Sequence, residues 1–418
     1  MLLRRIVVCA CLLTAAISVP STPAAQAGCA PDNATHNPVR CWAELVQQAI
    51  QVGRPPASSE VLHALVTLAV YDAVVAVEGG YQPYAGGVGT HAGADLSAAV
   101  ATAAYLTVTG KVTLADAPRG ALDSAYAAYM NLVPGGSAKA EGIEAGTLAA
   151  AAVLENRQDD GFGAPATYTC TAVPPPAGEF EPNGGCGTGV VDAMLARMRP
   201  YTFADAHKMV PEGPVLSTED FIETRDYGRD ESTFRSADQT DVVYFWSENT
   251  YAQWNRHLIA LAGDLGLGPL ETARMFAMVH TASADAIIVG FTAKYHYRFW
   301  RPRTAIPALD DPSWSPLLSV THPEYPSAHA FWSTALTSSL TQLLGTHRVA
   351  WTIDSRAPEL DPGARERTYY DLKALAREID DARVWAGLHW RHSMRHGAKI
   401  GREVARHVSR NFFKPLAS

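Results

Sequence analysis

Hydrophobic residues recur with helical spacing along most of the chain. Between residues 40 and 155, segments such as "SSEVLHALVTLAVYDAVVAV" and "DLSAAVATAAYLTVTGKV" place apolar side chains three and four positions apart. This spacing gathers them on one side of a helix, whereas a strand would require strict alternation, which is scarce here. Several segments begin with Ser or Asp, which are typical N-cap residues. The pattern predicts an all-α protein.

The composition changes after residue 158. Residues 159–237 are rich in Pro, Gly, Thr and Asn, with "CTAVPPPAGEFEPNGGC" as the extreme, and helical spacing then resumes at "ADQTDVVYFW". We therefore expect two packed helix bundles, residues 28–158 and 238–418, with a long irregular excursion between them and one compact domain overall. Aromatic and apolar residues in "RPYTFADAHKMVPEGP" favour an ordered excursion over a flexible linker.

Residues 1–27 have the pattern of an export signal. Two arginines precede a mostly apolar run at 6–19, and Ala-Gln-Ala at 25–27 resembles a cleavage site. The run is too short to cross a bilayer. The most apolar later segment, residues 61–77, contains a histidine and an aspartate, which favours a buried helix over a membrane span. We expect a secreted, extracellular protein that begins at Gly28.

The charge balance is acidic. The chain has 42 acidic and 34 basic residues, for a net charge of −8, and removal of the signal takes away two arginines and no acid, which gives −10. Nucleic acid and anionic membranes are poor partners for such a surface. The sequence gives no indication of the oligomeric state.

Four cysteines follow the signal. An even number in an exported chain favours two disulfides, most simply Cys29 with Cys41 and Cys170 with Cys186. Free buried thiols are one alternative. Lipidation of Cys29 is another, because "AQAGC" loosely resembles a lipobox.

The stretch "KYHYRFWRPR" concentrates cations and aromatic rings. If a helix runs from residue 269 to 300, Lys294, Arg298 and Arg301 lie on one face, and Pro302 ends the helix. A cationic stripe at a helix C-terminus is often only a solvated end that the helix dipole favours. We expect Arg298 to pair with an acid of the second bundle.

Two further clusters contain histidines. In "HPEYPSAHAFW", Ser327 is the natural N-cap of a helix whose free N–H groups favour an anion, and His329 lies in the first turn. In "ARVWAGLHWRHSMRHG", a break at Gly387 would let Arg383 and His389 face one pocket. A zinc triad of His389 with the two later histidines is a minor alternative, because no H-E-x-x-H glutamate accompanies them.

Together the three clusters contain the groups that a tetrahedral oxyanion requires. Fixed cations neutralise the equatorial oxygens of such an anion when it becomes five-coordinate, as in phosphoryl transfer. One histidine attacks or ligates at an apex, and the other exchanges a proton at the opposite apex.

The same clusters resemble the motifs of the type 2 phosphatidic acid phosphatase and vanadium-dependent haloperoxidase superfamily. The first motif, lysine, six residues and Arg-Pro, is matched from Lys294 to Arg301 and the proline after it. The second, Pro-Ser-Gly-His, is matched by "PSAH" with Ala328 in place of glycine. The third, arginine, five residues and histidine, is matched by Arg383 and His389. "HALVTLAVYDAVVAV" and "ADQTDVVYFW" also resemble the secreted bacterial haloperoxidase-like branch.

The resemblance implies roles for these residues. In a haloperoxidase of this kind, His389 is the axial ligand of the vanadium in vanadate, and Lys294, Arg301 and Arg383 neutralise the equatorial oxygens. Such an enzyme is an oxidoreductase that acts on hydrogen peroxide, a halide and a small organic acceptor. In a phosphatase, phosphate takes the place of vanadate and His389 is the nucleophile.

The remaining roles lie in the second motif. Ser327 and the backbone N–H of Ala328 would donate hydrogen bonds to the oxyanion. His329 would be the acid–base in a haloperoxidase and would protonate the leaving group in a phosphatase. His322 precedes Ser327 by five residues, where haloperoxidases tend to place a residue near the halide side, although a surface loop position explains it equally well.

Two positions depart from the family pattern. Ala328 adds a methyl group where backbone approaches the oxyanion and disfavours a positive φ. Ser393 stands where the family usually has an aspartate that orients the histidine four residues earlier. We expect a haloperoxidase-like enzyme. A secreted acid phosphatase is the alternative, and these two departures make a degenerate oxyanion-binding protein a further one.

Overall fold

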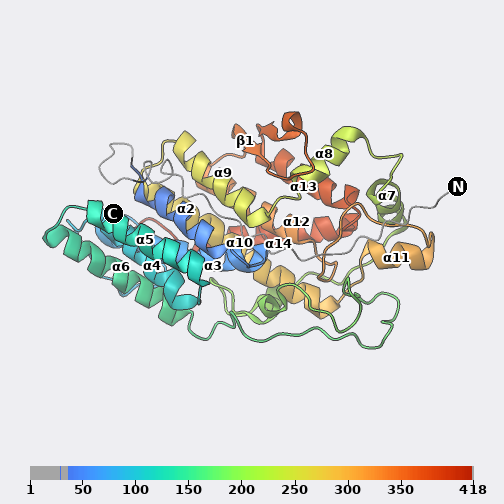
Figure 1. The fold of residues 1–418 in the computed structure, drawn as a ribbon, viewed down its shortest axis with the longest axis horizontal. Helices are drawn as coiled ribbons and strands as arrows, with labels where there is room; N and C mark the ends of the chain where they lie inside the picture. The colour runs from blue at the N-terminus through green and yellow to red at the C-terminus, as the bar shows by residue number, and fades with distance from the viewer. Residues whose placement is uncertain (1–28, 30–35, 417–418) are drawn as a thin grey trace.

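The computed structural model describes residue 29 and residues 36–416, so the predicted export signal lies outside the described residues. This part of the chain contains 13 α-helices and one two-stranded sheet, which confirms the all-α prediction (Figure 1). In chain order the helices are α2 (Pro38–Ile50), α3 (Pro56–Glu78), α4 (Leu96–Lys111), α5 (Asp116–Leu132), α6 (Ser137–Asn156), α7 (Thr218–Gly228), α8 (Ala237–Phe245), α9 (Thr250–Asp264), α10 (Pro269–Tyr297), α11 (Pro302–Leu309), α12 (Ala328–Leu344), α13 (Leu372–Trp385) and α14 (Arg391–Asn411). Strands β1 (Trp351–Asp354) and β2 (Glu366–Tyr369) pair antiparallel, with Trp351 opposite Tyr369.

Helix α10 is the centre of the molecule. Its side chains are buried without interruption from Met275 to Lys294, and a helix that is apolar on all sides must lie in a core. It packs on α3 on one side and on α12 and α14 on the other, between the N-terminal and C-terminal helices (Figure 1). Helices α3 and α10 are long and apolar enough to span a membrane, but 94% and 100% of their most apolar windows are buried inside the protein. We therefore interpret both as core helices.

Three glycines allow α12 to pack closely against its neighbours. A Cβ at Gly290 of α10 would lie 2.0 Å from the Phe331 ring. On α14, a Cβ at Gly397 would lie 2.9 Å from the Ser327 carbonyl oxygen, and one at Gly401 would lie 2.5 Å from that of Phe331. These contacts fix the N-terminal half of α12, which contains the second sequence motif, between α10 and α14.

The excursion is ordered, as predicted, but it is not wholly irregular. It contains two 3₁₀ turns, η1 (Ala193–Arg197) and η2 (Ala206–Met209), and the full helix α7, which Ser217 caps through the N–H of Asp220. Asp285 of α10 accepts hydrogen bonds from the backbone N–H groups of Tyr201 (2.5 Å) and Thr202 (3.0 Å). The excursion is thus anchored on the central helix.

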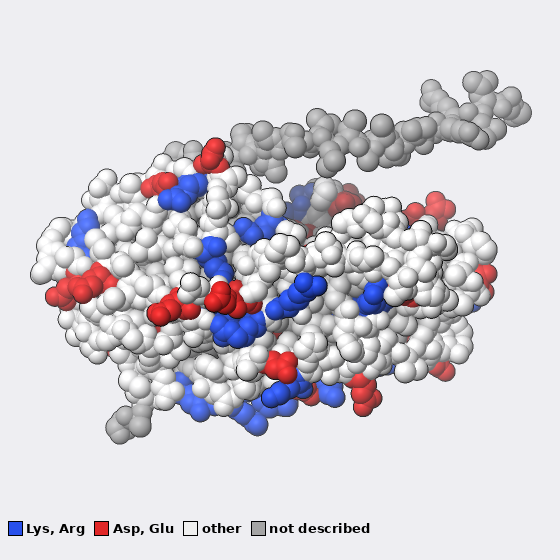
Figure 2. Space-filling view, turned by 90° about the horizontal axis from the view of Figure 1, so that it is seen from below, with Lys and Arg blue, Asp and Glu red and all other residues white. Residues whose placement is uncertain are grey.

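Both predicted disulfides form, Cys29 with Cys41 and Cys170 with Cys186. The Cα atoms are 5.4 Å and 5.7 Å apart, within the usual range for a disulfide. The alternatives of free thiols and of a lipidated Cys29 are therefore wrong for this structure. Basic and acidic side chains are interspersed on the face in Figure 2, over a largely uncharged surface.

Candidate active site

Helix α10 ends earlier than the sequence indicated. Its last residue is Tyr297, and Arg298 adopts a left-handed conformation with φ of 52°. Pro302 begins α11 rather than ending α10, and Arg301 is the N-cap of α11. Lys294 and Arg301 therefore do not share a face of one helix, and the predicted cationic stripe is wrong.

The excursion explains this early end. The Arg298 carbonyl accepts a hydrogen bond from the Phe180 N–H (2.7 Å), and its guanidinium pairs with Glu179 and lies over the Tyr168 ring. These contacts draw the backbone out of the helical path. Arg298 does pair with an acid, but that acid belongs to the excursion and not to the second bundle.

Lys294 and Arg301 are both buried and both bind the loop before α12. The Lys294 ammonium donates to the carbonyl oxygens of Pro323 (2.8 Å) and Glu324 (3.0 Å). Arg301 donates to the His322 carbonyl (2.7 Å), and its guanidinium lies 3.0 Å from His322 Nδ1. Burial lowers the pKa of Lys294 well below its usual value and that of Arg301 to about 9, because a charged group loses hydration there.

Ser327 is the N-cap of α12, as predicted, but its side chain makes no capping hydrogen bond. Its hydroxyl is buried and has no hydrogen-bond partner among the described residues, so it remains available to a ligand. Ala328 is the first residue of α12 and has no positive φ. Replacing the usual glycine at this position therefore imposes no backbone strain.

His329 and Arg383 lie beside the turn between α8 and α9. The Nε2 atom of His329 is 3.2 Å from the Thr250 hydroxyl, and Arg383 donates to the Trp246 carbonyl (3.2 Å). Burial lowers the pKa of His329 well below 6.5, and the nearby Arg383 lowers it further. Burial also lowers the pKa of Arg383 to about 10, and its Nε atom is buried without a partner within residues 36–416.

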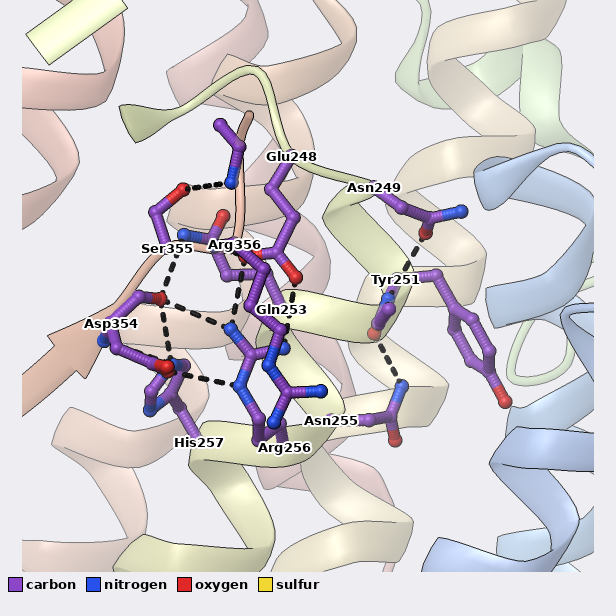
Figure 3. A network of polar contacts seen from close by, with 12 residues as sticks. Glu248, Asn249, Tyr251, Gln253, Asn255, Arg256, His257, Asp354, Ser355 and Arg356 are labelled. Atoms are coloured by element: carbon purple, nitrogen blue, oxygen red, sulfur yellow. Dashed lines mark hydrogen bonds and ion pairs between the residues drawn. The ribbon is translucent and has the colours of Figure 1, made fainter. Parts of the chain in front are cut away.

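A polar network holds that turn in place. Arg256 of α9 donates to both carboxylate oxygens of Glu248 (2.9 Å each) and to Asp354 of β1 (2.9 Å). Figure 3 shows Arg256 between these two acids, with His257 on the other side of Asp354. Because Glu248 lies in the turn, the network fixes the Trp246 carbonyl and the Thr250 hydroxyl, which contact Arg383 and His329.

His389 lies in the link between α13 and α14. Gly387 has a φ of 71° and breaks the two helices apart, as the sequence predicted. Arg383 is therefore in the last turn of α13, and His389 lies two residues before α14. The pKa of His389 is lowered well below 6.5, first by burial and then by the neighbouring cations Arg301 and Lys294.

Glu324 is a site residue that the sequence reasoning missed. Its carboxylate oxygen Oε1 lies 2.8 Å from His389 Nδ1 and also accepts the Trp390 N–H (3.1 Å). Glu324 is fully buried, and burial raises its pKa to about 7 against the opposing effect of Lys294 and Arg301. The sequence offered one indication of this role, because Glu324 lies between two prolines in "HPEYPS", directly before the second motif.

Glu324 supplies the carboxylate that the family pattern places at residue 393. The Ser393 hydroxyl lies close enough to lower the pKa of Glu324, and the Ser393 carbonyl accepts the Ser327 N–H (3.2 Å). A carboxylate at Nδ1 favours the histidine tautomer with its proton on that atom, which leaves a lone pair on Nε2. The change to serine therefore does not deprive His389 of an orienting acid.

A cavity of about 320 Å³ lies at the centre of these residues. Of the eight predicted site residues, five line it: His322, Ala328, His329, Arg383 and His389. Lys294, Arg301 and Ser327 are buried beside these five but are not among the residues that line the cavity. Phe291, Phe331 and Trp332 form an apolar wall, and Asp192 of the excursion adds a carboxylate that the sequence did not indicate.

Positive charge exceeds negative charge at this site. Glu324 is the one acid that acts on both Lys294 and Arg301, and no charged neighbour within the described chain offsets the burial of Arg383. Buried cations are costly unless opposite charge accompanies them. The site therefore fits a bound anion.

The three histidines considered for zinc go to different partners. His389 pairs with Glu324 (2.8 Å), His392 pairs with Asp220 (2.9 Å), and His396 bonds to the Tyr325 hydroxyl. Within residues 36–416, no three His, Cys, Asp or Glu side chains are grouped to hold a metal ion.

The fold is that of bacterial vanadium haloperoxidases. A structure described as the first bacterial vanadium-dependent iodoperoxidase superposes with a TM-score of 0.77 at 21% identity, covering 91% of this chain and 98% of that chain. A holo-type bacterial vanadium-dependent chloroperoxidase gives a TM-score of 0.65 at 15% identity, covering 85% of this chain and 92% of that chain. An apo-type bacterial vanadium-dependent chloroperoxidase gives a TM-score of 0.64 at 15% identity, covering 84% of this chain and 91% of that chain. No curated protein matches the chain in sequence.

The protein thus combines the all-α fold of the vanadium haloperoxidases with a buried cavity that is rich in cations. Residues 274–417 match the family described as the VCPO second helical-bundle domain, and this segment contains all three motifs. Residues 274–417 thus form a domain of that family, and the chain as a whole shares the fold of the bacterial vanadium haloperoxidases.

Proposed function

We propose that this protein is a vanadium-dependent haloperoxidase, which oxidises a halide with hydrogen peroxide and transfers the oxidised halogen to a small organic acceptor. The observation that carries the proposal is the excess of buried cations beside His389, whose Nδ1 is held by Glu324. Solved relatives of the same fold are described as vanadium-dependent iodoperoxidase and chloroperoxidase, which supports it. The two disulfides similarly support our proposal that the chain is exported.

The residues present fit vanadate. Lys294, Arg301 and Arg383 would neutralise its oxygens, and the buried Ser327 hydroxyl and the Arg383 Nε–H, both without partners in the described chain, would donate to it. The first-turn N–H groups of α12, including that of Ala328, add further donors. His389 would ligate vanadium through Nε2.

The chain's own residues would transfer protons and determine how halide reaches the cavity. Bound vanadate supplies a Lewis acid that activates peroxide. His329 is neutral near pH 7 because its pKa is lowered, so it can accept a proton from peroxide as it enters the cavity and return it to the product. Halide would approach along the apolar wall formed by Phe291, Phe331 and Trp332, next to His322.

A soluble acid phosphatase is the second candidate. The same cations and hydrogen-bond donors would accommodate phosphate, which shares the tetrahedral geometry of vanadate. The Glu324 carboxylate at His389 Nδ1 (2.8 Å) favours this candidate as well, because it strengthens the histidine as a nucleophile. His329 would then protonate the leaving group.

Replacement of His329 by alanine separates the proton-transfer role from the binding role. We expect peroxide-dependent iodide oxidation to fall by about 10²- to 10⁴-fold, while vanadate affinity changes little, because the cations and His389 remain. Triiodide absorbance measures the first quantity and isothermal titration calorimetry the second. His347→Ala, at a partly exposed position just beyond the C-terminal end of α12, is the matched control. Full activity in His329→Ala would overturn the acid–base assignment.

A further inference from the structure

A second, larger groove of about 570 Å³ lies between α12, α13 and α14. It shares no lining residue with the 320 Å³ cavity beside His389, which we call the oxyanion cavity. Its cationic lining residues are Lys373, Arg377, Arg402, Arg406 and Arg410, and its one acidic lining residue is Asp380. Hydroxyl and amide side chains of α12, from Thr334 to Gln342, form a third wall, and Leu372, Ala376 and Ala398 add apolar surface. The groove is therefore strongly positive in a protein whose net charge is −8.

The cations form two rows. Arg402, Arg406 and Arg410 lie four residues apart on α14, so their Cα atoms are about 6 Å apart along the helix. Lys373 and Arg377 have the same spacing on α13. In the part of the chain that the structure describes, none of the five makes an ion pair, unlike Arg391 at the start of α14, which pairs with Glu223 and Asp381. All five side chains are solvent-exposed, so an anion can reach both rows, and its charge would offset the repulsion between them.

Asp380 adds a second and independent indication of a ligand. Its Oδ1 atom is buried and lacks a hydrogen-bond partner among the described residues. Burial raises the pKa of this carboxyl to about 7, although Arg391 and Arg402 oppose the shift. A buried acceptor without a donor is costly and is rarely left unsatisfied.

We propose that this groove binds a polyphosphorylated small molecule. Its phosphate groups lie between the two rows of cations, and a hydroxyl or amino group on it donates a hydrogen bond to Asp380. Four of the five cations are arginines, whose planar guanidinium groups bind phosphate in a bidentate manner. The volume is within the usual range for a small-molecule site.

The test is calorimetric titration of the full-length protein at low ionic strength with two probes, tripolyphosphate and adenosine triphosphate. We expect both to bind, and Arg402→Glu/Arg406→Glu to weaken binding of both by about tenfold or more, because repulsion replaces attraction at two positions. Arg348→Glu/Lys399→Glu makes the same charge change at exposed positions outside the groove, and we expect it to change affinity less than about twofold.

The probes also test the role of Asp380. Tripolyphosphate has no nucleoside hydroxyl or amino group, so Asp380→Leu should shift the ratio of the two affinities in favour of tripolyphosphate. An unchanged ratio would remove Asp380 from ligand binding. Absence of binding to the wild type, equal losses in both double variants, or binding lost only in Arg383→Ala would overturn the proposal, the last by placing the probe in the oxyanion cavity.

Discussion

His389→Ala is expected to abolish vanadate binding and, with it, peroxide-dependent halide oxidation. His389 lines the cavity and presents Nε2 with its opposite nitrogen held by Glu324 at 2.8 Å. Alanine removes the imidazole that would hold vanadate and leaves the Glu324 carboxyl without its imidazole partner. We expect activity to fall by about three or more orders of magnitude, as for other residues that act as the reactive group.

Two measurements check this result. Calorimetric titration with orthovanadate gives the affinity, and circular dichroism establishes that the variant remains folded. His407→Ala replaces a partly buried histidine near the far end of α14 and should leave vanadate affinity unchanged. Vanadate affinity retained in His389→Ala would remove His389 as the ligand and with it the proposed centre.

Glu324→Gln has the second largest expected effect. The amide keeps the size of the side chain and can still accept the Trp390 N–H, but the negative charge at His389 Nδ1 is lost. Groups that orient a metal-ligating histidine typically contribute 10- to 100-fold, so we expect vanadate affinity to fall by about that factor. The measurement is again vanadate titration, combined with iodide oxidation.

A pH profile separates positioning by charge from a merely structural role. The pKa of Glu324 is raised to about 7, so the carboxyl takes up a proton as the pH falls through 7 and the charge at His389 disappears. Wild-type vanadate affinity should therefore decline below about pH 7, and this decline should be absent in Glu324→Gln. Identical profiles in the two proteins would contradict the positioning role.

A second substitution offers rescue. Ser393 is buried beside Glu324, at the position where the family pattern has aspartate. In Glu324→Gln/Ser393→Asp, the carboxylate comes from α14 instead of the loop, and we expect part of the lost affinity to return. Ser393→Asp alone should not help, because two neighbouring carboxylates would repel each other. Failure of the double variant to improve on Glu324→Gln would argue that only the loop can present the carboxylate.

The motif residues could be predicted from the sequence because their spacing is local. Arg383 and His389 are separated by one helix end, and the glycine between them, Gly387, indicates in the sequence where that helix ends. The Cys170–Cys186 pairing was similarly foreseeable, because the two residues are 16 positions apart in a segment without helical pattern. The all-α fold followed from periodicity that extends over most of the chain.

Contacts between distant segments could not be predicted in this way. Glu324 meets His389 across 65 positions, and nothing in either local pattern requires the pairing. The early end of α10 depends on Glu179, which lies 119 positions before Arg298. Helix α7 begins after Ser217, a recognisable N-cap, but its surroundings rich in Pro and Gly obscured it.

Net charge was also a poor guide to local charge. The acidic total excluded polyanions as general partners of the surface, yet five cations converge on the groove between α13 and α14. The row on α14 is visible in "GREVARHVSR" as arginines four residues apart. Its convergence with Lys373 and Arg377 depends on how the two helices pack, which the sequence alone does not specify.

The most direct test of the proposed function is the activity of the vanadate-loaded protein. Peroxide-dependent oxidation of iodide and bromide would be measured with and without orthovanadate, alongside hydrolysis of an aryl phosphate by the unloaded protein. We predict halide oxidation that requires both vanadate and peroxide, with phosphate hydrolysis at background. Absence of halide oxidation, together with phosphate hydrolysis that vanadate abolishes, would contradict the haloperoxidase proposal and identify a phosphatase.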